Sequence, residues 1–230
     1  MTVTTSAERL NAIGARLGGV QRYLEIGVAK GTTFFQVNAA EKHGVDPRFR
    51  FDPLSRSHQS HEHYHQISSD AYFQQAIGRE TPFDLIFLDG LHTYSQTLRD
   101  FLASQPLAHP RTVWLIDDTV PTDAIAADPD LQRVQAARQA SGHSADQTWM
   151  GDVFKLVAFI DSFCPQFSCF TTEGHGQTVV LPKLQAPAPK RFNNVQEIEQ
   201  LSYVDVLLLQ ESLLKATPFE QILAEIEPLP

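Results

Sequence analysis

The sequence predicts an α/β fold: a doubly wound, mostly parallel sheet of seven strands that ends in an antiparallel hairpin, followed by a helical C-terminal tail. Segments typical of strands and of helices alternate for five rounds along the chain. Short apolar runs bounded by proline or glycine, such as Phe83–Leu88, are typical of strands buried on both faces of a parallel sheet. Near the end, the strand-like segments Gln166–Thr172 and Gln177–Leu181 flank a turn that contains two glycines, which predicts the hairpin.

Length and charge limit the classes of protein that fit. A chain of 230 residues is long enough for one large α/β domain. Its formal net charge of −9 argues against a nucleic acid or an anionic membrane as the main partner. We find neither a membrane-length apolar run nor a signal peptide, and Cys164 and Cys169 lack a second pair that would make a zinc site. These features predict a cytoplasmic enzyme or binding domain with reduced thiols.

The chain begins with a predicted helix and a predicted strand. Leucine and isoleucine recur on one stripe of Ser6–Leu17, which predicts an amphipathic helix with Ser6 as its N-cap. Gly18 and Gly19 are expected to end it. Gln21–Val28 follows as the first strand of the core.

A glycine turn follows this strand in the pattern E-x-G-x-x-x-G, from Glu25 through Gly27 to Gly31, and a helix is predicted over residues 32–37. Glycines allow a cofactor to approach the backbone closely, and a helix N-terminus attracts negative groups. Nineteen residues after Gly27, Asp46 ends a short strand and is placed to accept hydrogen bonds from a ribose diol. The alternatives are a plain turn and an acid that caps a turn before proline.

Arg48–Gln66 is predicted to be a long irregular loop. It contains His58, His61, His63 and His65, and their spacing suggests a metal site. However, no cysteine accompanies them and their neighbours are polar, which favours a solvated loop. Such a loop at the carboxyl edge of a sheet could act as a lid.

The second half of the chain continues the alternation and ends in a tail. Domain boundaries are predicted at residues 1–182 for the core and 183–230 for a proline-rich linker and helical tail. An apolar stripe on the tail, formed by Val204, Leu207, Leu208 and Leu213, is expected to pack on the core or on another copy in a homodimer. The other predicted elements are a helix over Ala71–Gly78 capped by Asp70, a helix from Thr93 to Leu102, a strand over Thr112–Ile116, a helix over Asp128–Ala140 and a helix over Val153–Phe163.

Acidic residues follow two of the predicted strands. Phe83–Leu88 runs into Asp89, with His92 three residues later, and the next strand runs into Asp117 and Asp118. If the two strands are neighbours, three carboxylates and an imidazole meet at one edge of the sheet, where open α/β sheets bind ligands. Carboxylates packed together repel one another unless a cation is present, and oxygen ligands without thiolates favour Mg²⁺. The alternatives are a helix cap and a histidine bonded to the backbone.

These segments together resemble a class I S-adenosylmethionine-dependent methyltransferase, whose sheet also ends in a hairpin. Within that class, the D-G-x-H motif combined with D-D is similar to the metal-dependent O-methyltransferases that act on macrolide sugars and related natural products. The resemblance covers roughly residues 23–181. The segments that carry it are Tyr23–Thr33, Gly44–Pro47, Leu88–Tyr94, Asp117–Asp118 and Gly151–Lys155.

The resemblance implies a role for each of these residues. It implies that the chain transfers a methyl group from S-adenosylmethionine to a hydroxyl of a sugar or other small natural product, with Mg²⁺ holding the acceptor. His92 would be the general base, and Asp89, Asp117 and Asp118 would be the metal ligands. Glu25 and Gly27 would contact the methionine part of the cofactor, Asp46 its ribose and Asp70 its adenine. The complete set of implied cofactor-binding residues is Glu25, Gly27, Gly31, Asp46 and Asp70.

Two other functions are compatible with the same fold. One is a nicotinamide-dependent oxidoreductase, although the turn lacks the middle glycine of the G-x-G-x-x-G dinucleotide fingerprint. The other is a non-catalytic partner protein that keeps the methyltransferase fold and binds through its helical tail. Cofactor binding separates the three hypotheses.

Overall fold

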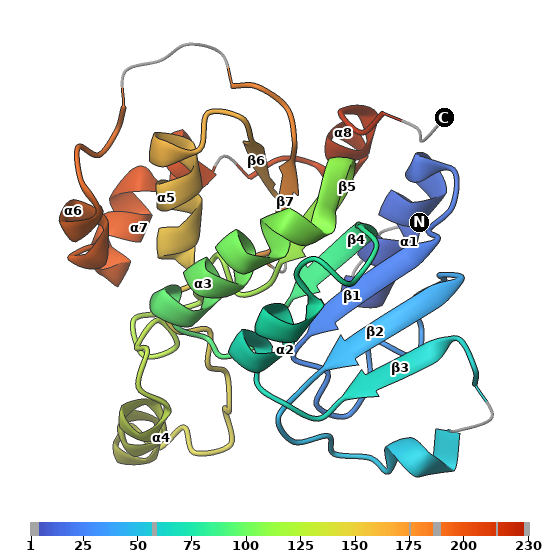
Figure 1. Ribbon diagram of the computed structural model, residues 1–230. Coiled ribbons are helices and arrows are strands. Elements are labelled where there is room, and N and C mark those ends of the chain that lie inside the picture. Colours follow the sequence, from blue (N-terminus) through green and yellow to red (C-terminus); the bar gives the residue numbers. More distant parts are fainter. Residues whose placement is uncertain (1–4, 57–58, 175, 186–189, 215, 228–230) are drawn as a thin grey trace.

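The computed structural model describes residues 5–56, 59–174, 176–185, 190–214 and 216–227, and Figure 1 shows how their helices and strands are arranged. Seven strands form one sheet in the order β3-β2-β1-β4-β5-β7-β6. The strands β1 to β5 pair in parallel, whereas β7 is antiparallel to both β5 and β6. The predicted mostly parallel sheet with an antiparallel terminal hairpin is therefore confirmed.

The elements follow one another along the chain with connections of different lengths, and the longest ones include those between β1 and β2 and between β5 and α4. No helix among the described residues is long and apolar enough to cross a membrane. The strands are β1 (Arg22–Ile26), β2 (Glu41–Val45), β3 (Glu62–His65), β4 (Phe83–Leu88), β5 (Ala108–Ile116), β6 (Ser168–Thr171) and β7 (Thr178–Leu181). The helices are α1 (Ser6–Leu17), α2 (Ser69–Ala76), α3 (Tyr94–Ser104), α4 (Leu131–Ala140), α5 (Phe154–Phe163), α6 (Val195–Glu199), α7 (Tyr203–Leu209) and α8 (Phe219–Ala224), with short η1 (Pro53–Arg56), η2 (Gln105–Leu107) and η3 (Gln210–Leu214).

The strand order reverses at β1, because β2 lies on one side of it and β4 on the other. In register, Ile26 of β1 lies beside Leu88 of β4, and Leu88 lies beside Ile116 of β5. The three strands therefore end at one level of the sheet. Open α/β sheets bind their ligands beyond the carboxyl ends of the strands at such a reversal. The fold thus places a candidate site after β1, β4 and β5.

Helices cover both faces of the sheet (Figure 1). Side chains from α2, α3 and α5 pack on one face, whereas α1 and α8 pack on the other. Along β4, Ile86 and Leu88 face the first layer and Leu85 and Phe87 face the second, and all four are at most 2% exposed. Burial of one such side chain stabilises the fold by about 1.5–3 kcal/mol. The prediction that this strand is buried on both faces is confirmed.

One carboxylate joins the amino ends of three core strands. Asp84 Oδ2 accepts hydrogen bonds from the backbone N–H groups of Gln21 and Arg22, at 2.7 and 2.9 Å. Its Oδ1 lies 2.9 Å from His109 Nε2. Because Asp84→Ala leaves these partly buried donors without an acceptor, we expect the free energy of unfolding, measured by urea denaturation, to fall by about 2–4 kcal/mol.

A surface aspartate provides the matched control for this variant. Asp52 is exposed, and its Oδ1 accepts one hydrogen bond, 3.0 Å long, from the backbone of Leu54. Water can replace that bond, so Asp52→Ala should change the free energy of unfolding by less than about 1 kcal/mol. Equal effects of the two substitutions would contradict the role assigned to Asp84.

The helix predicted over residues 32–37 does not form. These residues make consecutive turns, in which the backbone N–H of Phe35 donates to Gly31 O at 3.0 Å. Phe34 is fully buried and packs over β2, where its ring would lie 3.0 Å from a Cβ placed on Gly44. After this inward turn the chain continues without regular structure into β2. The predicted alternation of strands and helices therefore fails between β1 and β2.

Two helices begin at other caps than the predicted ones. The N-cap of α1 is Thr5 instead of Ser6: Thr5 Oγ1 accepts from Glu8 N at 3.2 Å, and Glu8 Oε2 accepts from Thr5 N at 3.0 Å. These two reciprocal hydrogen bonds form a capping box. Ser6 could not form one, because no glutamate or glutamine lies three residues after it. In α2 the N-cap is Ser68, so Asp70, predicted as the cap, lies in the first turn.

The loop predicted over Arg48–Gln66 contains the short helix η1 and the edge strand β3. In β3, His63 pairs with His43 of β2. The prediction of a solvated loop is therefore wrong for this strand, and His58 lies outside the described residues. In the sequence of β3, charged or aromatic residues alternate with histidines. The alternation of apolar and polar residues that marks a half-buried strand is therefore missing.

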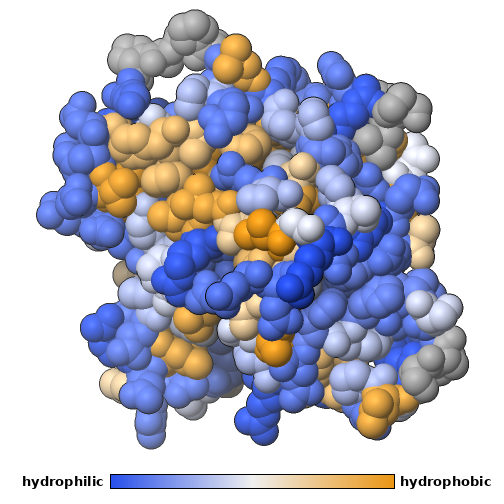
Figure 2. All heavy atoms as spheres, viewed as in Figure 1, coloured by the Kyte–Doolittle hydropathy of each residue, from blue (hydrophilic) through white to orange (hydrophobic). Residues whose placement is uncertain are grey.

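The C-terminal tail packs on both helical layers. Ile198 of α6 is buried with residues of α5, and Ile222 of α8 is buried with residues of α1. The surface over α5 and its neighbour α3 is rich in apolar residues (Figure 2).

Only part of the apolar stripe predicted on the tail is buried, because α7 continues into the π-helical η3, which changes the angle between successive side chains. Leu213 is buried, whereas Val204, Leu207 and Leu208 are 61%, 53% and 77% exposed.

Candidate active site

The predicted site residues follow three adjacent strands. Gly27 comes directly after β1, Asp89 after β4 and Asp117 after β5. One further backbone hydrogen bond on each side of β4 holds these strand ends together: Asp89 N donates to Ile26 O at 2.9 Å, and Asp117 N donates to Leu88 O at 3.0 Å. The ends of these strands therefore bring the predicted cofactor turn and the predicted acids to one rim, as the sequence predicts.

An imidazole and two carboxylates converge at this rim. His92 Nδ1 lies 2.8 Å from Asp118 Oδ2, and His92 Nε2 lies 3.6 Å from Asp89 Oδ1. One ligand atom from each of these three residues lies within 4.8 Å of the other two. Each could contribute to a cation site, so the structure groups the predicted base with two of the three predicted metal ligands.

The third predicted ligand, Asp117, is oriented differently. Its Oδ1 accepts a hydrogen bond from the backbone N–H of Asp118 at 2.9 Å, and its charge interacts with Arg9. Asp118 has a left-handed backbone with φ of 60°, a conformation that aspartate tolerates better than most residues. This backbone turn separates the two neighbouring side chains, and Asp118 alone is grouped with His92 and Asp89.

Trp149 and Gly151 hold the His92 loop in place. The Trp149 ring stacks on the His92 ring, with centroids 4.8 Å apart and planes 19° from parallel, and His92 Nδ1 lies 2.7 Å from Trp149 O. Gly151 approaches so closely that a Cβ there would lie 1.6 Å from His92 O. Asp152 Oδ1 accepts from Tyr94 N at 2.7 Å. Sequence reasoning does not identify Trp149 as a neighbour of His92, because no spacing rule links two residues 57 positions apart.

The proximity of the charges changes the protonation of the cluster. Burial alone would lower the pKa of His92, but hydrogen bonds with Asp118 and Asp89 outweigh it and raise that pKa to about 11. Desolvation, opposed by the hydrogen bond with His92, acts with the charges of Asp117 and Asp118 to raise the pKa of Asp89 to about 7. At neutral pH, in the absence of a bound ion, the imidazolium is the cation that balances this acidic rim.

A cavity of about 630 Å³ opens beside the cluster. A volume of this size is typical of a pocket for a small molecule or cofactor. Its wall includes the predicted residues Gly27, Asp46, Asp70, Asp89 and His92, together with Trp149. The cavity therefore connects the predicted cofactor-binding residues to the acidic cluster.

The predicted cofactor-binding residues differ in how they meet this cavity. Asp46 accepts from Ala29 N at 2.8 Å and from Arg48 N at 2.7 Å, so its carboxylate is fixed at the mouth of the turn. Asp70 is exposed and forms an ion pair with Arg99 at 3.3 Å. Backbone groups therefore hold Asp46, whereas the side chains of Arg99 and Gln96 hold Asp70.

Glu25 and Gly31 lie next to the cavity instead of in its main wall. Glu25 lines a smaller adjoining depression together with Gly27 and Asp89. It is almost fully buried and accepts from the Tyr23 hydroxyl at 2.5 Å, and burial raises its pKa well above the usual range. Gly31 lines neither space. Its φ of 77° closes the turn, and a Cβ there would lie 2.3 Å from the Phe35 ring.

Comparisons with known proteins agree with this architecture. The family model described as a methyltransferase domain matches residues 24–119. No curated protein matches the sequence. The O-methyltransferase from Bacillus cereus in complex with SAH superimposes with a TM-score of 0.52 at 17% identity, over 77% of this chain and 80% of that one. The O-methyltransferase TomG from Streptomyces achromogenes, involved in tomaymycin synthesis and in complex with SAM, superimposes with a TM-score of 0.50 at 18% identity, over 80% and 82%.

These similarities concern the fold and the segment from β1 to the end of β5. The matched segment contains the glycine turn, Asp46 and all the acids of the rim. By its fold and by this segment, the chain resembles the class I S-adenosylmethionine-dependent methyltransferases, as its sequence motifs predict.

Proposed function

We propose that the protein is an S-adenosylmethionine-dependent O-methyltransferase that acts on a hydroxyl of a sugar or other small natural product, with Mg²⁺ at the acidic cluster. The observation that carries the proposal is the grouping of Asp89, His92 and Asp118 beside a cavity lined by the glycine turn. Its position at the reversal of strand order is where this type of sheet binds ligands.

The residues of the cavity fit the methyl donor. Gly27 lines the cavity without a side chain, and its backbone packs directly against that of Asp89, where a Cβ would lie 1.8 Å from Asp89 O. Asp46, fixed by two backbone N–H groups, is suited to accept hydrogen bonds from the ribose hydroxyls. Glu25 would interact with the methionine part and Asp70 with the adenine. When bound, S-adenosylmethionine supplies a methyl group on a positively charged sulfur.

The acidic cluster fits a hard divalent cation. Asp89 and Asp118 provide carboxylate oxygens without any thiolate, which is the donor type that Mg²⁺ prefers. Asp117, the third acid of the predicted ligand set, adds negative charge next to Asp118. A bound cation would lower the pKa of an acceptor hydroxyl that it coordinates.

His92 would accept the proton of the acceptor hydroxyl. The stacked Trp149 ring and the Trp149 carbonyl fix the orientation of its imidazole, which general base catalysis requires. Because hydrogen bonds with Asp118 and Asp89 raise its pKa, His92 becomes a base only when the charge of these two carboxylates is balanced otherwise. The O–H bond would then break toward His92 while the oxygen takes the methyl group from sulfur.

Calorimetric titration with S-adenosylhomocysteine, with and without Mg²⁺, tests the cofactor part of the proposal. We expect binding in the micromolar range. Asp46→Asn should weaken it at least about tenfold, because a buried amide is a poorer acceptor for two hydroxyls than a carboxylate. Asp130→Asn removes the same charge from the N-cap of α4, where asparagine caps equally well, and should bind normally. A folded, cofactor-free protein that gives no heat would contradict the proposal.

A further inference from the structure

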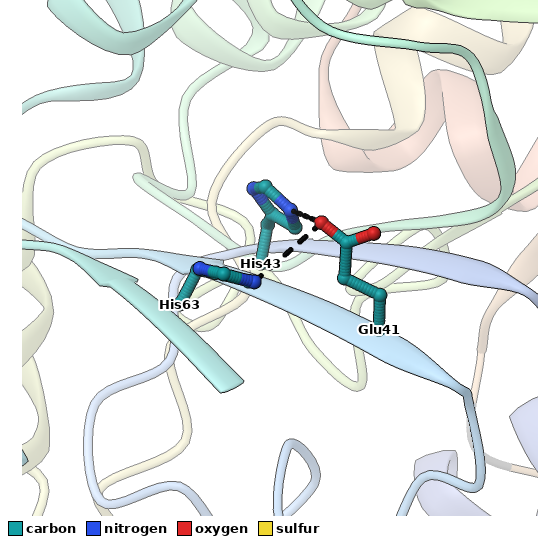
Figure 3. Close-up of side chains that lie close together, drawn as sticks. All are labelled: Glu41, His43 and His63. Atoms are coloured by element: carbon teal, nitrogen blue, oxygen red, sulfur yellow. Dashed lines mark hydrogen bonds and ion pairs between the residues drawn. The ribbon is translucent and has the colours of Figure 1, made fainter. Parts of the chain in front are cut away.

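A second group of metal-ligating side chains lies on the edge strand β3 and on its neighbour β2. Glu41 and His43 of β2 and His63 of β3 point toward one another on one face (Figure 3). Glu41 begins β2, whereas Asp46, which lines the cavity, follows its end. At about 3.3 Å per residue, roughly 16 Å of strand separates the two positions. The group is therefore distinct from the candidate active site.

The distances within this group suit a tetrahedral metal ion. Glu41 Oε1 lies 2.7 Å from His43 Nε2 and 3.5 Å from His63 Nε2. The three ligand atoms all lie within 4.8 Å of one another. Metal–ligand bonds of about 2.0 Å in tetrahedral geometry place ligand atoms about 3.3 Å apart. Small side-chain rotations would therefore bring all three atoms to one ion.

A fourth residue, His65, orients the central ligand. His65 Nε2 lies 3.2 Å from His43 Nδ1, on the side of the ring opposite Glu41. When Nε2 of a histidine binds a metal, its other nitrogen usually carries a proton that a neighbouring group accepts. His65 Nε2 is therefore placed to accept that proton.

Access and charge are compatible with an ion. His43 is only 5% exposed at its side chain, whereas His63 and Glu41 are 44% and 37% exposed, so the site opens to solvent on one side. Arg22 Nη2 lies 3.0 Å from His43 Nε2, 3.2 Å from Glu41 Oε1 and 2.6 Å from Glu80 Oε2. A bound ion would have to displace this guanidinium from both ligand atoms, and Arg22 would keep Glu80 and Glu41 Oε2 as partners.

We propose that Glu41, His43 and His63 form a second cation site that binds Zn²⁺ or a similar divalent transition metal and ties the edge strand β3 to β2. Two imidazoles and one carboxylate, with a position open to water, are a donor set that Zn²⁺ uses in proteins. This mixed nitrogen and oxygen set differs from the carboxylate oxygens at the active-site rim, which favour Mg²⁺. The two sites should therefore take different metals.

Titration of the metal-free, full-length protein with Zn²⁺ in excess Mg²⁺ tests this site. We expect one Zn²⁺ to bind, and Co²⁺ in its place should give the visible absorption of a four- or five-coordinate ion. His63→Ala should weaken Zn²⁺ binding at least about tenfold, and Glu41→Gln should do the same. His63 is largely exposed, so its removal leaves the core intact.

Two further variants locate the bound ion. His143→Ala removes an exposed histidine beyond α4 and should leave Zn²⁺ affinity unchanged. Asp118→Asn alters the active-site rim and should also leave it unchanged. The proposal is overturned if the wild-type protein binds no Zn²⁺, if His63→Ala binds it as tightly as the wild type, or if Asp118→Asn abolishes it. None of these readouts requires methyl transfer.

Discussion

Asp118→Asn is expected to reduce methyl transfer by roughly 10²-fold or more and to weaken Mn²⁺ binding, measured in place of Mg²⁺, at least about tenfold. The amide is isosteric, and its oxygen can still accept a hydrogen bond from His92 Nδ1, which lies 2.8 Å from Asp118 Oδ2. The substitution therefore removes charge from the cluster without removing its packing. A divalent ion held by Asp89 and one neutral amide loses most of the electrostatic attraction that binds it.

Two measurements separate this effect from a change in folding. Binding of S-adenosylhomocysteine should change by less than about threefold, because Asp118 does not line the cavity. Mn²⁺ binding, followed by electron paramagnetic resonance, needs no knowledge of the acceptor. The control Asp130→Asn, at the N-cap of α4, should behave as wild type in both assays. Wild-type Mn²⁺ affinity in Asp118→Asn would remove the metal from the proposed mechanism.

The fold was predictable wherever burial dictates residue type. The β4 strand is buried on both faces, and apart from Asp84 near its start its sequence is apolar, which identifies it without ambiguity. In contrast, β3 lies at the edge of the sheet, and its inward positions are filled by Glu62 with Lys42 and by histidines. Ion pairs and the aromatic contacts of Tyr64 take the place of aliphatic packing there. The strand is therefore invisible to a search for hydrophobic alternation.

The candidate site was predictable to the level of strand ends, but not of side-chain orientation. The rule that parallel strands end at one edge was sufficient to bring Asp89 and the Asp117–Asp118 pair together. Of the two neighbouring acids, Asp118 is the one grouped with His92, and this depends on the left-handed backbone of Asp118. The stacking of Trp149 on His92 depends on a loop that is distant in sequence. Local patterns do not encode either contact, because both arise from the tertiary path of the chain.

Gly27→Ala is expected to lower the free energy of unfolding by about 3–5 kcal/mol and to abolish measurable binding of S-adenosylhomocysteine. A Cβ at this position would lie 1.8 Å from Asp89 O and 2.4 Å from Asp89 C. These are backbone atoms, and they are held in place because Asp89 N donates to Ile26 O at 2.9 Å. The clash can be relieved only if the ends of β1 and β4 separate. That separation would both deform the cofactor turn and move Asp89.

Gly78→Ala provides the matched control for this prediction. Gly27 and Gly78 both have positive φ, at 91° and 78°, so alanine introduces similar backbone strain at each. At Gly78, however, a Cβ would meet no atom within 4 Å. We therefore expect Gly78→Ala to lose only about 1–2 kcal/mol in urea denaturation and to bind the ligand normally. If the two variants lose equal stability, strain alone explains Gly27; a larger loss at Gly27 shows that the β1 and β4 ends must touch for the site to form.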